Sequence, residues 1–276
     1  MKLSFNTKAE LFKHLKDNKS LLVAEKKATL KQADAISYGV PVTCPNGEAV
    51  KSESFEAEDL NTIKAEVVIN TTNILDSHGD VHMKGIWKKS LSEKKLLYLL
   101  QEHEMKFDKV ITDELKASVK KYTWAELGFK NFEGTTEALV FDAVINADRN
   151  EYMFEQYIKG RVKNHSVGMQ YVNIILCINS DERYYAEEKA NWDKYIKEVV
   201  NKEDAEALGY FWAVTEARVI EGSAVLRGSN YATPTLSVTE TKDIEADVIT
   251  STEPLISTQI KQGLDYNYLF TNLKLK

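Results

Sequence analysis

Three side chains of the types used in acyl transfer stand in the β-prone part of the chain, and the first is His103. It follows the apolar run 96–100, where a buried strand is expected to end. At a strand end a side chain can reach a cleft while its backbone stays fixed, which suits a general base. A polar residue that caps the strand fits the same position, so a catalytic role for His103 requires a partner.

Ser166 is the second such residue. It lies in the segment 163–169, after a helix stop expected at Gly160, and at the start of the most β-prone run in the chain. A hydroxyl nucleophile needs a neighbouring imidazole and amides that hold an oxyanion, and Gly168 would allow a close backbone approach. An ordinary strand serine fits the same tripeptide. His165 must point to the other side of the strand, which indicates a structural neighbour rather than the base.

Glu221 is the third, at the start of the segment 221–226. Alternation along a strand places Glu221, Ser223 and Val225 on one face. A carboxylate that shares an inward face with an apolar side chain needs a partner, and an imidazole is one candidate. The alternative is an edge-strand glutamate that faces solvent.

A rival set of residues could bind a metal ion. Asp76, His78, Asp80 and His82 occur at every second position, so a strand would place all four on one face, where zinc or another divalent metal could bind. Gly79 and Asp80 favour a turn instead, and a turn scatters the side chains. A metal-dependent hydrolase is therefore the weaker interpretation.

The elements that must position these residues change in character along the chain. Residues 1 to about 35 have apolar side chains at helical spacing, 38–61 has turn residues and an acidic run, and short β-rich runs follow from 63 to about 236. The expected strands are 65–71, 96–101, 138–145, 166–178, 210–215 and 218–226. Helices are expected over 149–159 and about 182–208, the second being a packing helix, a lid or a dimer contact.

Because these strands do not alternate regularly with helices, the sequence predicts an α+β fold with a mixed or antiparallel, barrel-like sheet surrounded by helices. We divide the chain into a helical N-terminal arm and linker (1–60), a central domain (61–236) and a flexible C-terminal tail (237–276). The tail is rich in Thr, Ser and acidic residues until its last few aromatic side chains.

Composition excludes several classes of protein and partner. The chain has 276 residues, and its 36 basic and 42 acidic side chains give a net charge of −6, so no global positive field favours nucleic acid. Only two cysteines occur, which argues against a disulfide scaffold or a zinc ribbon. The apolar runs, such as 174–178, are far shorter than the roughly 20 residues of a membrane span. We expect an intracellular soluble protein without a cofactor.

Taken together, the segments resemble the prohead serine proteases of tailed bacteriophages, capsid-maturation enzymes distantly related to herpesvirus assemblins. The block 73–87 is similar to the family's Asp-x-x-Gly-Asp block that ends in Pro-Gly-Ala-Phe, with Lys84 in place of the proline and Ile86-Trp87 in place of Ala-Phe. The block 165–169 is similar to the nucleophile strand Ser-[Ile/Val]-Gly-[Phe/Met]. This second block is the most telling of the three.

The third block, 221–230, is similar to Glu-Val-Ser-Leu-Val followed by Pro-Ala-Asn, with Gly228-Ser229 in place of Pro-Ala. His103 lies between the first two blocks, where the family carries its catalytic histidine after an apolar strand. The blocks occur in the family's order, and the resemblance covers about 65–232. Residues 1–60 and 237–276 fall outside it, so the central domain is the expected prohead protease domain.

The resemblance implies a serine endopeptidase in which Ser166 is the nucleophile, His103 the general base and Glu221 the residue that orients the imidazole. It implies cleavage of the scaffold protein, of the major capsid protein and of the enzyme itself, in the host cytoplasm inside the assembling prohead. Related assemblins dimerise, which makes a homodimer an expectation here too. The alternative is a catalytically silent assembly protein with the same fold, and no metal or cofactor is implied.

Overall fold

The computed structural model describes residues 5–29, 60–93 and 95–240. Most of the expected linker and the tail beyond residue 240 lie outside these residues. The described residues belong to one compact unit, residues 1–241. Its elements form the mixed α+β architecture that the sequence predicts.

The first sheet is antiparallel throughout, with the order β5-β6-β1-β9. Its strands are β1 (Thr62–Thr71), β5 (Leu115–Thr123), β6 (Thr135–Asn146) and β9 (Thr235–Glu240). Residues 237–240, which the sequence analysis assigned to the tail, form most of β9 and pair with the first half of β1. The chain therefore stays in the sheet at least as far as Glu240.

The second sheet is mixed, and its long central strand is β8 (Tyr210–Val225). On one side β8 pairs antiparallel with β7 (Asn164–Ile178), and on the other it pairs in parallel with β2 (Asp80–His82) and β3 (Leu99–Gln101). The strand β4 (Val110–Thr112) continues the sheet beyond β3. The two strands expected over 210–226 are one strand, because pairing with β7 continues through local register shifts.

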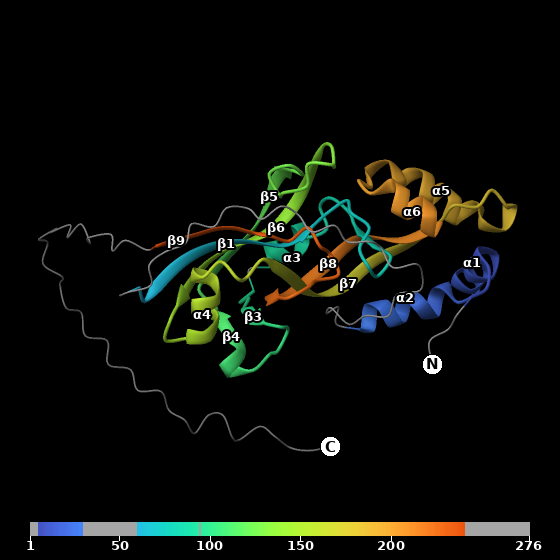
Figure 1. The fold of residues 1–276 in the computed structure, drawn as a ribbon. Coiled ribbons are helices and arrows are strands. Elements are labelled where there is room, and N and C mark those ends of the chain that lie inside the picture. The colour runs from blue at the N-terminus through green and yellow to red at the C-terminus, as the bar shows by residue number, and fades with distance from the viewer. Residues whose placement is uncertain (1–4, 30–59, 94, 241–276) are drawn as a thin grey trace, which may run out of the picture. The chain divides into compact units, whose positions relative to one another are not determined.

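The expected barrel does not form, because the strands stay in two separate sheets (Figure 1). An isolated bridge between Asn164 of β7 and Pro234, the residue before β9, and a hydrogen bond from the His165 N–H to the Thr233 carbonyl link the two sheets locally. The sheets also meet through side chains. Gly222 of β8 lies against Phe141 of β6 and Ile69 of β1, in the main hydrophobic core.

Four helices beyond the N-terminal arm accompany the sheets in the described part of the chain: α3 (Lys88–Ser92), α4 (Glu151–Ile158), α5 (Ala186–Tyr195) and α6 (Lys202–Leu208). The side chain of Asn150 caps α4 by accepting a hydrogen bond from the Met153 N–H. The helix expected over 182–208 is divided into α5 and α6, and α5 packs on β7. Gly209 ends α6 in the left-handed conformation.

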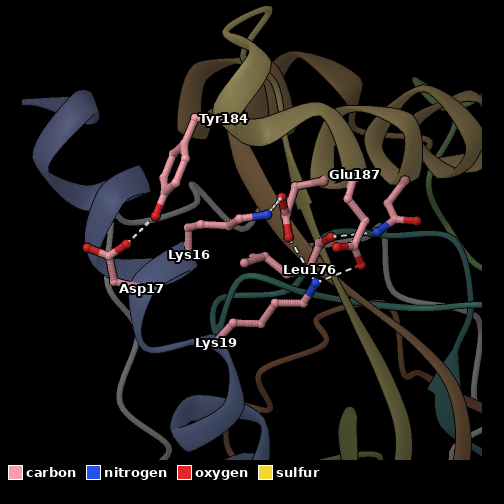
Figure 2. Close-up of polar contacts among 8 residues, drawn as sticks. Lys16, Asp17, Lys19, Leu176, Tyr184 and Glu187 are labelled. Atoms are coloured by element: carbon pink, nitrogen blue, oxygen red, sulfur yellow. Dashed lines mark hydrogen bonds and ion pairs between the residues drawn. The ribbon is translucent and has the colours of Figure 1, made fainter.

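The expected N-terminal helical region contains α1 (Lys8–Asp17) and α2 (Lys19–Ala28). Figure 2 shows lysines of these two helices pointing toward α5, where Glu187 is labelled. Lys16 and Lys19 donate to the two carboxylate oxygens of Glu188 at 2.5 and 2.9 Å, and Glu188 is completely buried. Although burial opposes its ionisation, the hydrogen bonds from both lysines lower the pKa of Glu188. The two N-terminal helices are thus held by charges as well as by buried apolar side chains such as Leu15.

Candidate active site

His103 and Glu221 meet in a short hydrogen bond. The His103 Nδ1 atom lies 2.6 Å from Glu221 Oε1, and the two side chains are only 6% and 1% exposed. A hydrogen bond to a carboxylate is stronger in such a dry environment than in water. When Nδ1 carries the proton of this bond, Nε2 on the other side of the ring is the basic nitrogen.

A glycine makes room for the Glu221 carboxylate. Gly168 of β7 stands opposite Glu221 of β8 in the antiparallel pair. A Cβ atom at Gly168 would lie 1.9 Å from Glu221 Oε1, so any larger residue would occupy the place of the carboxylate. The close approach anticipated at Gly168 is therefore that of a side chain, and it explains a glycine in the middle of a strand.

Strand register brings Ser166 to the same face of the sheet. Ser166 stands directly opposite Ser223, two residues from the pair formed by Gly168 and Glu221. Residues two apart on a strand share a face, and opposite Cβ atoms are about 4.5–5.5 Å apart. The Ser166 side chain is buried but not fully closed off, with 7% of the residue exposed.

His165, next to the candidate nucleophile, belongs to a different environment. It is completely buried, and its Nε2 atom lies 3.0 Å from the Tyr157 hydroxyl. Burial lowers the pKa of His165 to about 4, against the opposing effect of a hydrogen bond with the Thr233 backbone. The structure therefore gives His165 a place in the packing of α4 against β7.

The backbone that carries His103 adopts an unusual turn. Leu100 of β3 pairs with Ser223 of β8, and the chain then passes through Glu102 and His103 with φ angles of 52° and 61°. Two successive non-glycine residues in the left-handed region cost about 1–3 kcal/mol each, and such costs are common at functional sites. His103 thus lies two residues beyond the strand end.

Two hydrogen bonds from this turn to β8 hold it in place. The Glu102 N–H donates to the Ala224 carbonyl at 3.0 Å, and the His103 N–H donates to Ser223 Oγ at 3.1 Å. The Ser223 hydroxyl in turn donates to Glu221 Oε2 at 2.6 Å. Sequence reasoning placed Ser223 on the face of Glu221 but gave it no role. The spacing of two residues was the signal that could have identified it.

The loop that follows β8 lies against the candidate nucleophile. A Cβ atom at Gly228 would lie 3.5 Å from Ser166 Cβ and 2.9 Å from the His165 carbonyl oxygen. Asn230 anchors the loop to β1, because its side-chain amide donates to the Thr71 carbonyl at 2.8 Å and accepts the Thr71 hydroxyl at 3.1 Å. The third sequence block therefore contributes a glutamate in the strand and a loop beside the serine.

The first sequence block, proposed above as a possible metal site, forms a hydrogen-bonded turn. Asp76 Oδ1 accepts the backbone N–H groups of His78 and Asp80, both at 2.9 Å. The Ser77 N–H donates to the Ser229 carbonyl at 3.2 Å, which ties this turn to the loop beside Ser166. The turn that Gly79 and Asp80 favoured is thus present, with φ of 73° at Gly79.

Asp80 and His82 are engaged in a buried polar network. Asp80 accepts the Tyr171 hydroxyl at 2.8 Å and forms an ion pair with Lys26 of α2, and His82 contacts Asn70 and Tyr171. Burial lowers the pKa of His82. Within the described ranges no three side chains from His, Cys, Asp or Glu gather as ligands of one metal ion would. Asp76 Oδ1 accepts two backbone N–H groups, and Asp80 and His82 both contact the Tyr171 hydroxyl, so these three side chains take part in hydrogen bonds within the protein.

Comparison with family models, with curated proteins and with solved structures yields no match for this chain. No helix in the described ranges is long and apolar enough to cross a membrane.

Proposed function

We propose that this chain is a serine endopeptidase with Ser166 as nucleophile, His103 as general base and Glu221 as the residue that orients the imidazole. The observation that carries the proposal is the buried hydrogen bond between His103 and Glu221 on the face of the sheet where register places Ser166. Three residues distant in sequence share one small region. Their residue types are those of an acyl-transfer triad, and the contact between the histidine and the acid is the one such a triad requires.

The chemistry follows from these positions. His103 Nε2 takes the hydroxyl proton as Ser166 Oγ attacks the carbonyl carbon of the scissile peptide bond, and Glu221 stabilises the imidazolium that forms. The imidazolium then protonates the leaving amine, which leaves an acyl ester on Ser166. Water, deprotonated by His103, hydrolyses this ester and restores the serine. We assign the oxyanion site to backbone N–H groups of the loop around Gly228, because this loop lies against Ser166.

The substrates follow from the resemblance to prohead proteases. We propose that the enzyme cleaves the scaffold protein, the major capsid protein and its own chain inside an assembling prohead in the host cytoplasm. A homodimer is part of the same proposal. Sedimentation velocity across a concentration series measures it, and a single species at the mass of one chain at all concentrations contradicts it.

A fluorophosphonate probe tests the nucleophile directly, because it forms a covalent adduct with an activated serine. We expect one adduct by intact mass, located on the peptide that contains Ser166. Ser166→Ala should abolish the adduct, and Glu221→Gln should slow its formation by at least about 100-fold because the imidazolium loses its charge partner. Ser90→Ala is the matched control, since Ser90 is a buried serine that accepts the Val219 N–H outside the site.

Two results would contradict the proposed enzymatic function. An adduct that survives Ser166→Ala places the nucleophile elsewhere. A folded wild-type chain that forms no adduct, yet binds capsid or scaffold protein in a pull-down with purified components, is the catalytically silent assembly protein. Thermal unfolding of each variant separates a lost nucleophile from a lost fold.

A further inference from the structure

We infer that Ser223 is a positioning residue of the active site, holding the Glu221 carboxylate and the His103 backbone in one arrangement. The inference rests on the proposed function of the triad and adds a residue to it. Ser223 is completely buried at the middle of the second sheet. It stands between Leu100 of β3 and Ser166 of β7, so one side chain borders both strands that supply the base and the nucleophile.

The direction of each hydrogen bond is fixed by chemistry. A backbone N–H can only donate, so Ser223 Oγ accepts from His103 N at 3.1 Å. An ionised carboxylate can only accept, so the Ser223 hydroxyl proton points at Glu221 Oε2, 2.6 Å away. The single hydroxyl therefore uses its proton and a lone pair at once, and no freely rotating hydroxyl remains.

Glu221 is thereby held at both oxygens. Oε1 receives the His103 ring at 2.6 Å, and Oε2 receives Ser223. The carboxylate lies directly over Gly168, which has no side chain to hold it. The Ser223 hydroxyl supplies a second polar contact in addition to that of His103.

The same hydroxyl also supports the strained turn. Glu102 and His103 are both in the left-handed region, and their backbone N–H groups are the two that reach β8. The acceptor for Glu102 is a backbone carbonyl that any residue would provide. The acceptor for the His103 N–H is the Ser223 side-chain oxygen. This second hydrogen bond therefore requires a side chain at position 223 that can accept.

Removal of the hydroxyl takes away the acceptor of the His103 N–H and the donor to Glu221 Oε2. The expected consequence is a triad that samples several arrangements. Because both hydrogen bonds of Ser223 Oγ go to Glu221 and to the His103 backbone, the loss should appear in the chemical step, with substrate affinity almost unchanged.

Two measurements test the inference on the full-length protein. The first is the downfield proton resonance of the His103 imidazole Nδ1–H in histidine-labelled protein, assigned by its loss in His103→Ala. The second is the rate of fluorophosphonate labelling. We expect Ser223→Ala to broaden or shift the resonance upfield by more than about 1 ppm and to slow labelling about 10- to 100-fold, the range for a lost buried hydrogen bond. Ser90→Ala should leave both unchanged.

An unchanged resonance and an unchanged labelling rate in folded Ser223→Ala overturn the inference. If Ser223→Ala does not fold, Ser223→Cys is measured in its place, because it keeps an atom at the same position but donates only weakly. The same expected and contradicting results apply to it. The resonance reports on the histidine without any turnover, so it separates failure of this inference from failure of the protease. Failure of the proposed protease function would be shown by labelling that persists in Ser166→Ala.

Discussion

At the scale of single residues, the site depends on the lack of a side chain at position 168 as well as on the three functional groups. Gly168 leaves room that the Glu221 carboxylate fills. From the sequence, this glycine was expected to allow a close approach of the backbone. In the structure, the missing side chain at Gly168 leaves room for the Glu221 carboxylate, which reaches His103 on the turn after β3.

Gly168→Ala is therefore expected to damage both activity and stability. The new methyl group would overlap Glu221 Oε1, so the carboxylate must leave its hydrogen bonds with His103 and Ser223. We expect fluorophosphonate labelling to fall by roughly 10- to 100-fold and the free energy of unfolding to fall by about 1–3 kcal/mol. A variant that labels at the wild-type rate would show that the carboxylate does not need its observed place.

The burial of His165 leads us to expect that the free energy of unfolding depends on pH. Its pKa is lowered from 6.5 to about 4 by burial, so the unfolded chain binds a proton in a range where the folded chain does not. Stability contributed by neutral His165 is complete above pH 6.5 and is lost as the pH falls toward 4, by at most about 3 kcal/mol.

Urea unfolding at several pH values between 4 and 7 measures this effect. His165→Gln can keep a hydrogen bond with Tyr157 but does not titrate, so its stability should fall less steeply with acid. The pKa of buried His82 is also lowered, which leaves part of the slope in place. Equal slopes for the variant and the wild type would contradict the assignment to His165.

At the scale of elements, the N-terminal helices α1 and α2 are joined to the rest of the described fold through buried acidic side chains. Lys16 and Lys19 neutralise Glu188 of α5, and Lys26 pairs with Asp80 of β2 (Figure 2 shows the first group). The composition of α1 and α2 predicted helices rich in lysine but gave no partner for their charges. The partners lie more than 50 residues away along the chain, which is why only the folded structure identifies them.

Simultaneous Lys16→Ala and Lys19→Ala should lower the free energy of unfolding by about 2 kcal/mol. A buried carboxylate then lacks its cations, and the effect is smaller than for fully buried pairs because both lysines stay partly in water. Adding Glu188→Gln should restore part of the loss. Lys13→Ala, which removes an exposed pair with Asp17, is the control and should leave unfolding unchanged.

Two of the strands that sequence reasoning did not predict, β5 and β9, lie at the two edges of the first sheet. Both alternate apolar with polar residues, with Leu115, Ala117 and Val119 in β5 and Leu236 and Val238 in β9. A period-2 signal for both strands was therefore present in the sequence. The short strands β2 and β4 have three residues each, too few to show any period.

At the scale of the whole molecule, the two sheets depend on close packing at Gly222. A Cβ atom there would lie 2.6 Å from Phe141 and 2.8 Å from Ile69, both in the first sheet. Gly222→Ala should therefore destabilise the fold by about 1–3 kcal/mol through overpacking, as measured by denaturant unfolding. Adding Ile69→Val removes one of the clashing atoms and should recover part of the loss. If the destabilisations caused by Gly222→Ala and Ile69→Val simply add, residues 222 and 69 are not coupled, which would contradict close packing of the sheets at this point.

The sequence by itself determined the composition class, the helical and β-rich segments, and the chemical types at positions 103, 166 and 221. These are local properties, because periodicity and residue type are written along the chain. Tertiary structure alone decided that the sheets remain two layers, that His103 occupies a left-handed turn, and that Ser223 joins it to Glu221. Such features depend on strand register and on contacts between distant segments, and a single residue of register would turn these side chains to the opposite face.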